Sequence, residues 1–212
     1  MNKRTFLKAA LAAPFLVSRR AAAEGPTAEA GAIAAQVSGR VNIGLDGIAE
    51  VIVYFLFVDG IGSDLFSGPP SERTAHFTLR ADRLRPILTP NADMIHIGFQ
   101  PAGNEGLYRV YYNPSPTNRD FSQPETFSQG SRIAVFKARR TQATVVPGSH
   151  TLVTGTADLV ESTEVTFKDA AFDIGGAYRV TSFTFHAKAL SIADLGVTTL
   201  SIPLGGHLIK VR

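Results

Sequence analysis

The sequence predicts an all-β protein, built either as a single antiparallel β-sandwich or as a closed β-barrel of about ten strands. The first observation is a run of eight apolar residues, Val51 to Val58, that ends at Asp59-Gly60. β-Branched and aromatic side chains dominate this run, which favours a strand over a helix. Because side chains alternate between the two faces of a strand, an unbroken apolar run predicts a strand that is covered on both faces.

Two further observations support this fold class. Short alternating runs recur between Gly and Pro residues at intervals of roughly 8 to 12 residues, which is typical of sandwiches and barrels. After the N-terminal segment, no window of about eleven or more residues carries the apolar stripe of a helix. Parallel strands need long crossovers, usually helices, so the sheet is expected to be antiparallel. The 212 residues, 44% hydrophobic and 18% charged, suit one domain with a sizeable core.

Residues 1–23 have the composition of an export signal peptide. Lys3, Arg4 and Lys8 form a basic start, an Ala-rich apolar core follows, and residues 21–23 offer a small-residue cleavage site. The core is much shorter than the run of about 18 residues that a spanning helix needs, so we expect no membrane span in the mature chain. Residues 24–35 are expected to form a flexible tether, and residues 36–212 the all-β domain.

The start of this leader resembles the twin-arginine (Tat-type) translocation signal, and the positions that carry the resemblance are Lys3, Arg4, Phe6, Leu7 and Lys8. Lys3 stands where the motif has its first arginine, so the general secretory route stays open as the alternative. The chain in this respect resembles the uncharacterised exported bacterial β proteins with twin-arginine-like leaders. The resemblance implies an export translocase as a partner and a periplasmic or extracellular location, and it implies no activity.

Removal of the leader changes the charge of the chain. The leader holds five of the 21 Lys and Arg residues and none of the 18 acidic residues, which leaves a net charge of −2. No basic stripe then indicates nucleic acid or an anionic membrane as a partner. The absence of cysteine excludes disulfides, thiolate metal sites and a cysteine nucleophile.

The strands are expected to follow one another along the chain with polar turns between them. Val37, Gly39, Val41 and Ile43 share one face of the first strand, and Leu45-Asp46-Gly47 turns the chain into 51–58. The remaining strands are expected at 73–81, 94–99, 107–112, 132–146, 150–160, 163–167, 178–188, 196–202 and 206–211. Two connections, 59–72 and 113–130, are long, and irregular loops of more than about 12 to 15 residues are uncommon unless they are functional or disordered.

The best candidate for a ligand-binding site is the group Tyr108, Arg109, Tyr111 and Tyr112, which directly precedes the 113–130 loop. Tyrosine and arginine are typical of recognition surfaces, because a flat ring offers apolar area together with a polar tip. This pattern predicts a non-enzymatic domain that binds a small molecule, a glycan or a protein through its long loops. The alternative is an ordinary aromatic-rich strand whose rings pack on the loop that follows.

Two other function classes stay open. One is a barrel enzyme, an isomerase or a metal-dependent oxidase, with histidines in an interior pocket; the other is a surface or assembly protein whose sheet edge pairs with its neighbours. The histidines lack the close spacing of metal motifs, so no metal and no cofactor is predicted. If a metal site were assembled from distant strands, its candidate ligands would be His76, His96 and His186. No catalytic residue is predicted.

Three weaker patterns have ordinary structural explanations. Asp59 and Asp64 on a Gly-rich loop could offer oxygens to calcium, but Gly and Asp are also the residues that turns need. Ser149 and His150 are expected to point to opposite faces of an extended chain, which would prevent a nucleophile and base pair. A solvated, edge-protecting face is expected from a basic cluster, with an anionic ligand as the alternative. Its members are Arg132, Lys137, Arg139 and Arg140.

Overall fold

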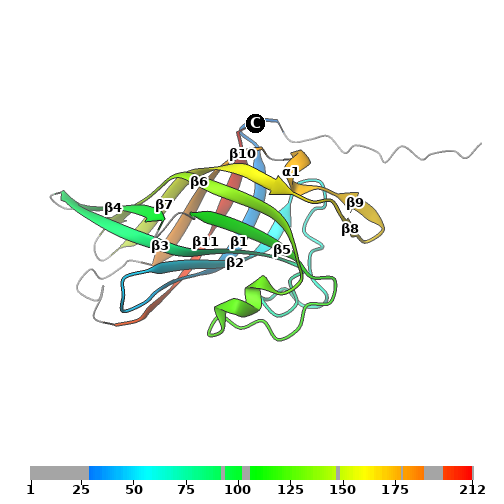
Figure 1. Cartoon of the computed structure of the whole chain (residues 1–212), viewed down its shortest axis with the longest axis horizontal. Helices are drawn as coiled ribbons and strands as arrows, with labels where there is room; N and C mark the ends of the chain where they lie inside the picture. The colour runs from blue at the N-terminus through cyan, green and yellow to red at the C-terminus, as the bar shows by residue number, and fades with distance from the viewer. Residues whose placement is uncertain are drawn as a thin grey trace, which may run out of the picture.

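The computed structural model describes residues 29–91, 94–101, 106–146, 149–177, 179–188 and 198–211. These residues form a closed, eight-stranded antiparallel β-barrel with additional strands (Figure 1). The all-β prediction is therefore confirmed. The predicted leader, with Lys3, Arg4, Phe6, Leu7 and Lys8, lies outside the described residues. Within the described part of the chain, no helix is long and apolar enough to cross a membrane.

Strands make up most of the described chain, and two short helices lie between them. The strands are β1 (Ile33–Ile43), β2 (Ala49–Val58), β3 (Phe77–Asn91), β4 (Met94–Pro101), β5 (Leu107–Tyr112), β6 (Ser131–Val146), β7 (His150–Ser162), β8 (Val165–Phe167), β9 (Ala170–Phe172), β10 (Val180–Lys188) and β11 (Leu200–Lys210). The helices are the 3-10 helix η1 (Pro124–Ser128) and the single-turn helix α1 (Ile174–Ala177).

The wall of the barrel closes through the pairing of β2 with β3. The order around the wall is β2-β1-β11-β10-β7-β6, followed by β4 and β5 together, and then β3. β4 and β5 share the space between β6 and β3, each of them pairing with one half of both neighbours. Closure corrects the sandwich alternative, because strands that pair all the way round leave the main sheet without the free edges of a sandwich.

The start of β1 corrects one predicted boundary. The composition of residues 24–35 predicts a tether that ends at residue 35, but β1 begins at Ile33, and both Ala34 and Ala35 are buried. Ala35 pairs with Leu208 on one side and with Val58 on the other. Alanines can form this part of the strand because their backbone is hydrogen-bonded to strands on both sides. Those two strands supply the larger apolar side chains that bury it.

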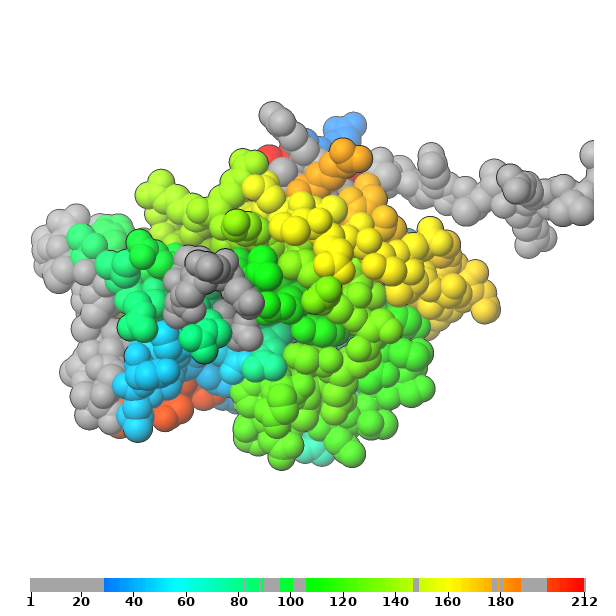
Figure 2. Space-filling view, viewed as in Figure 1, coloured from blue at the N-terminus to red at the C-terminus, as the bar shows by residue number. Residues whose placement is uncertain are grey.

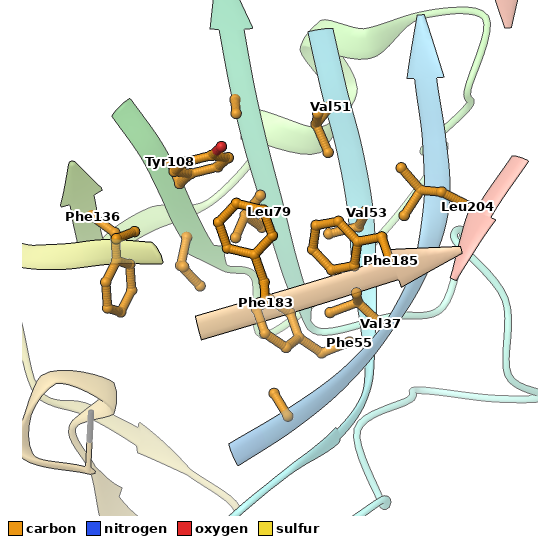
Figure 3. Close-up of a cluster of buried hydrophobic side chains, with 14 of the residues drawn as sticks. Val37, Val51, Val53, Phe55, Leu79, Tyr108, Phe136, Phe183, Phe185 and Leu204 are labelled. Atoms are coloured by element: carbon orange, nitrogen blue, oxygen red, sulfur yellow. The ribbon is translucent and has the colours of Figure 1, made fainter. Parts of the chain in front are cut away.

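Large apolar side chains fill the barrel interior (Figure 3). Val53 and Phe55 of β2 point into the same cluster as Phe183 and Phe185 of β10. The rings of Phe183 and Phe185 stack with their centroids 5.1 Å apart. The lumen is therefore a packed core rather than an open channel.

β2 is buried on its outer face as well, as the apolar run 51–58 predicts. Ile52 alternates with the inward-facing residues of β2, yet it is 0% exposed. Two segments outside the wall cover this side of the strand. The ring of Tyr54 packs on Phe66 of the 59–76 segment at 6.2 Å and on Phe121 of the 113–130 segment at 6.3 Å. The prediction of a strand covered on both faces is confirmed at Ile52, whereas Tyr54, Leu56 and Phe57 are only partly buried.

The 113–130 segment is fixed to the outside of β3. The hydroxyl of Thr78 donates to the carbonyl oxygen of Phe127 at 2.7 Å, and the guanidinium of Arg119 donates to the carbonyl oxygen of Ala75. The segment includes η1 and lies below the barrel wall in the view of Figure 1. Side chains of this segment are therefore presented on the outer surface of β2 and β3.

The short hairpin of β8 and β9 packs against one end of the barrel. Its rings Phe167 and Phe172 contact the ring of Phe77 at 5.1 and 6.0 Å. Tyr112 stacks on the same Phe77 ring at 5.0 Å. Aromatic pairs of this kind add to the free energy of burial, so the hairpin helps to close this end of the core.

Candidate functional site

An open groove of about 950 Å³ lies on the outside of the barrel, where the 113–130 segment meets β1, β2 and β3. In Figure 2 the 113–130 segment (green) bulges on the same side of the molecule as the turn between β1 and β2 (light blue). Most of the lining residues have polar side chains, and Phe121, Ile48 and Pro124 contribute apolar surface. The principal polar residues are Arg40, Asn42, Glu50, Arg80, Asp120 and Ser201.

Strand register explains why these side chains meet. Arg40 on β1 lies opposite Ile52 on β2, and Ile52 lies opposite Arg80 on β3. The three residues form one row across the outer face of the wall. Since neighbouring strands are about 4.8 Å apart, the two arginine Cα atoms are separated by about 10 Å. The adjacent row places Asn42 between Ser201 and Glu50.

A bulge in β3 adds a third arginine to the groove. The register between β2 and β3 shifts where Val51 pairs with Ala81 but Ala49 pairs with Leu84. Within this shift Arg83 adopts a left-handed backbone with φ of 59°, which is costly for a residue other than glycine. Bulges re-aim side chains, and Arg83 lines the groove.

Phe121 gives the groove an aromatic ring that is held in place. Its ring packs on Phe127 at 5.0 Å, in addition to its contact with Tyr54. The guanidinium of Arg40 lies 5.3 Å from the ring centroid, and its Nη1 donates to Ser201 Oγ at 3.3 Å. A cation over a ring is attracted by the ring quadrupole, so Arg40 and Phe121 orient each other.

The carboxylates of the groove are held by neighbouring donors. Glu50 accepts from Arg80 Nε, and Arg80 Nη1 also approaches Ser128 Oγ at 3.3 Å. The backbone N–H and the hydroxyl of Ser122 both donate to Asp120 at 2.8 Å, and these two bonds hold the pKa of Asp120 below its usual value. Both carboxylates therefore have fixed directions.

The arrangement can recognise a ligand that offers several hydroxyl groups. Hydroxyls both donate and accept hydrogen bonds, so they can accept from arginines and donate to carboxylate or amide oxygens. The Phe121 ring can pack against the apolar face of such a ligand. No histidine is among the described residues that line the groove.

The predicted ligand-binding group is divided between two faces of β5. Tyr108 points into the barrel, where it is 5% exposed and its hydroxyl lies 3.0 Å from Thr141 Oγ1. Tyr112 shares this inner face and packs on Phe77. Arg109 and Tyr111 lie on the outer face, opposite Arg80 and Thr78 of β3.

This division corrects the grouping of the four residues. Neighbours along a strand point to opposite faces, so Tyr108, Arg109, Tyr111 and Tyr112 cannot form one patch. Tyr108 is removed from the set, because a side chain packed inside the core does not reach a ligand at the surface. Arg109 is next to the groove residue Arg80 in the sheet.

The three candidate metal ligands lie on different parts of the wall. The ring of His76 packs on Phe167 at 5.5 Å, and its Nδ1 lies 2.9 Å from the carbonyl oxygen of Asn113. His96 Nδ1 is 3.4 Å from Thr144 Oγ1, and His186 is exposed on β10. Among the residues that the structure describes, no three His, Cys, Asp or Glu side chains are grouped as a metal site.

Small apolar cavities lie inside the barrel among the residues that the structure describes. Two apolar cavities of about 30 Å³ each share the lining residues Val41, Phe99 and Val153. A cavity of this size holds about one water molecule. Neither cavity is lined by His76, His96 or His186.

The structure also places the Gly-rich loop that holds Asp64 and the neighbours Ser149 and His150. Asp64 pairs with Lys168 of the β8–β9 turn. The expectation that Ser149 and His150 diverge is wrong, because Ser149 lies in a turn and its Oγ is 2.8 Å from His150 Nδ1. Both residues are exposed, and within the described chain no further group is hydrogen-bonded to the His150 ring to orient it as a base.

The basic cluster on β6 is exposed, as expected for a solvated face. Arg132 makes a two-oxygen contact with Glu161 at 3.0 and 3.1 Å. Arg139 pairs with Asp158. Lys137 and Arg140 are also exposed. Partial neutralisation by β7 carboxylates makes this face a weak site for an anion.

The groove shows which functional residues the sequence pattern misses. The length of the 113–130 loop singles it out, and Asp120, Phe121, Ser122 and Pro124 of this loop line the groove. Arg40 and Arg80 carry no local signal, since each is one polar residue on a strand. Only the pairing of β1, β2 and β3 brings them together.

Comparison of the chain with protein-family models, with curated proteins and with solved structures gives no match in any of the three.

Proposed function

We propose that the protein is an exported, non-enzymatic binding protein that takes a hydroxyl-rich small molecule, a short saccharide, in the outer groove beneath the 113–130 segment. The observation that carries the proposal is the groove itself, with its fixed arginines, fixed carboxylates and the Phe121 ring. Ligand sites are concave and use a few well-placed polar groups beside an apolar surface. The packed lumen favours this outer site over an interior one.

The proposal keeps part of the predicted ligand-binding group. Arg109 and Tyr111 lie on the outer face of β5, next to Arg80 and Thr78 of β3, and β3 separates them from Ile52 on β2. They do not line the groove itself, but they would contact a ligand that extends across β3. Tyr112 lies on the inner face of β5, where its ring stacks on Phe77 in the core.

A glycan array probed with the labelled mature protein tests the proposal, followed by calorimetric titration of any oligosaccharide retained. Phe121→Ala and Arg40→Gln are expected to weaken binding at least about tenfold, since each removes a fixed groove contact. Arg139→Gln, an exposed arginine outside the groove, is the matched control and should bind as the wild type does. Circular dichroism and the unfolding midpoint show that each variant is folded.

Two results would overturn the groove assignment. One is the absence of binding to any saccharide on an array of neutral and acidic glycans. The other is a retained saccharide whose affinity is unchanged in folded Phe121→Ala and Arg40→Gln proteins. Loss of affinity only in Arg109→Gln and Tyr111→Phe would move the site to the far side of β3.

The export part of the proposal rests on the leader. Its basic start, Ala-rich core and small-residue end support a signal peptide, and the absence of cysteine is compatible with an oxidising compartment. Fractionation of cells that express the full chain should place it outside the cytoplasm. Dependence on the twin-arginine translocase, strengthened by Lys3→Arg, would select that route; sensitivity to inhibition of the general secretory pathway would select the other.

The barrel-enzyme alternative has less support. It requires histidines that project into a pocket, whereas the interior cavities described above are small, apolar and lined by other residues. Stoichiometric metal in protein purified from its native host would restore it. The surface or assembly alternative would be supported by concentration-dependent oligomers in solution.

A further inference from the structure

Arg119 is the largest side chain in the described chain that is completely buried, with 0% of its surface exposed. It lies in the 113–130 segment, directly before the groove residue Asp120, and its guanidinium faces the 59–76 segment. Nη1 donates to the carbonyl oxygen of Ala75. Arginine is rarely buried without a partner for its charge.

Two of its nitrogen atoms have no acceptor. Nε and Nη2 are both buried and make no hydrogen bond within the described chain. These two atoms carry the parallel N–H bonds of one edge of the guanidinium plane. That edge is the fork that binds a carboxylate or another planar oxyanion through two oxygens. The unpaired atoms are therefore not scattered but form one complete recognition edge.

Several acceptors on the two segments already have a donor within the described chain. On the facing segment, the carbonyl oxygens of Leu65 and Thr74 accept from the backbone N–H groups of His76 and Ser67 at 2.9 Å. The carboxylate of Asp120 is held by Ser122, and that of Asp64 by Lys168. A buried charge that lacks a counter-charge destabilises the folded protein. Burial lowers the pKa of Arg119 to about 10, so the group is still charged at neutral pH.

We propose that the Nε and Nη2 edge of Arg119 holds a small planar oxyanion, of the size of formate, acetate or nitrate, between the 113–130 and 59–76 segments. Because the Arg119 side chain is completely buried, only a small anion can reach this edge. The anion neutralises the guanidinium and joins the two segments of the outer layer. It thereby fixes the segment that presents Asp120, Phe121 and Ser122 to the groove, although the anion site does not depend on what the groove binds.

The test measures the melting temperature of the mature protein while the anion is varied at constant ionic strength. Sodium formate, acetate or nitrate replaces a large, weakly coordinating organic sulfonate, and sulfate and phosphate serve as anions of the wrong shape and size. An anion that binds only the folded state should raise Tm by about 3 to 5 °C for each tenfold increase above its dissociation constant. Sulfate and phosphate should give a smaller rise.

Matched variants locate the effect. Arg119→Met removes the charge and the fork, and Arg119→Lys keeps the charge but removes the fork. Both should lose the dependence on planar anions, whereas Arg139→Met, which removes an exposed arginine, should keep it. If the Arg119 variants do not fold, line broadening of carbon-13 formate by the wild-type protein, with competition by nitrate, replaces them.

Each result of these measurements either supports or overturns the anion site at Arg119. A rise in Tm that is specific to planar anions and absent in Arg119→Met supports the site, as does competitive broadening of formate. Equal effects of all anions at constant ionic strength would overturn it, and so would a dependence that Arg119→Met retains. Sharp formate signals in the presence of folded wild-type protein would overturn it as well.

Discussion

The ring of Phe183 occupies the space that Gly155, its partner on the adjacent strand, leaves free inside the barrel. The two residues lie opposite each other on β10 and β7. A Cβ atom built on Gly155 would collide with the tip of this ring and would lie only 2.5 Å from the carbonyl oxygen of Arg140. Gly206 and Phe185 repeat the arrangement between β11 and β10. Glycine facing an aromatic ring is a recognised way to fill a curved sheet.

The first prediction is that Gly155→Ala destabilises the protein by about 1 to 3 kcal/mol, because the added methyl group must displace a buried ring or the backbone. Gly205→Ala is the matched control, since the nearest atom to its added Cβ is 3.7 Å away. The control should change stability by no more than about 0.5 kcal/mol. Urea unfolding measures both, and equal effects of the two substitutions would contradict the packing described for Phe183.

The second prediction concerns the buried hydrogen bond between Tyr108 and Thr141. Tyr108→Phe leaves the Thr141 hydroxyl without its partner and is expected to cost about 1 to 2 kcal/mol. The double variant Tyr108→Phe with Thr141→Val should recover part of this loss, since both polar groups are then absent. Tyr111→Phe, on the outer face, is the control and should change stability by about 0.5 kcal/mol or less. Strict additivity of the two single substitutions would count against the bond.

The third prediction is a loss of stability at alkaline pH that depends on Tyr108. Burial raises the pKa of Tyr108 from 10.0 to about 12, and the bond to Thr141 offsets this only in part. Between these values the unfolded chain releases the proton while the folded chain keeps it. The contribution is therefore fully present below pH 10 and is lost as the pH rises toward about 12. Free energies of unfolding measured across this range should fall less steeply in Tyr108→Phe, and parallel curves would refute the assignment.

The fourth prediction compares two ion pairs of different exposure. The side chains of Arg80 and Glu50 are 26% and 20% exposed, whereas those of Arg132 and Glu161 are 47% and 50% exposed. Glu50→Gln should cost about 1 to 2 kcal/mol, because it weakens the pairing of a partly buried guanidinium. Glu161→Gln should cost about 0.5 kcal/mol or less, because solvent screens the exposed pair. Chemical unfolding at low and high salt checks both values, and a larger cost at Glu161 would reverse the order expected from burial.

The fifth prediction concerns the turn between β8 and β9. Lys168 and Asp169 have φ of 47° and 66°, in the left-handed region that disfavours residues with a Cβ atom. Asp169→Gly should stabilise the protein by about 0.5 to 1 kcal/mol, since glycine adopts this conformation without the steric cost. Asp169→Ala keeps the Cβ atom and should bring no gain. Thermal unfolding distinguishes the two, and equal Tm values would show that the turn relaxes.

Part of the candidate site can be predicted from the sequence. The length of 113–130 and its two phenylalanines single out a loop that packs on the barrel, and this loop supplies Phe121 to the groove. The tyrosines and the arginine of the strand before it, 107–112, predict a single binding patch. Strand alternation sends Tyr108 into the core and Arg109 to the surface, so the pattern was informative for the core and misleading for the site.

Residue type and alternation along the chain are enough to predict an all-β protein with a largely buried strand at 51–58. Residue type and alternation are local properties, and they act within a few residues of the backbone. The closure of the sheet, the alignment of Arg40 and Arg80 on either side of Ile52, and the burial of Arg119 are seen only in the folded molecule. These features depend on which distant strands pair and in which register, and no local pattern specifies that choice.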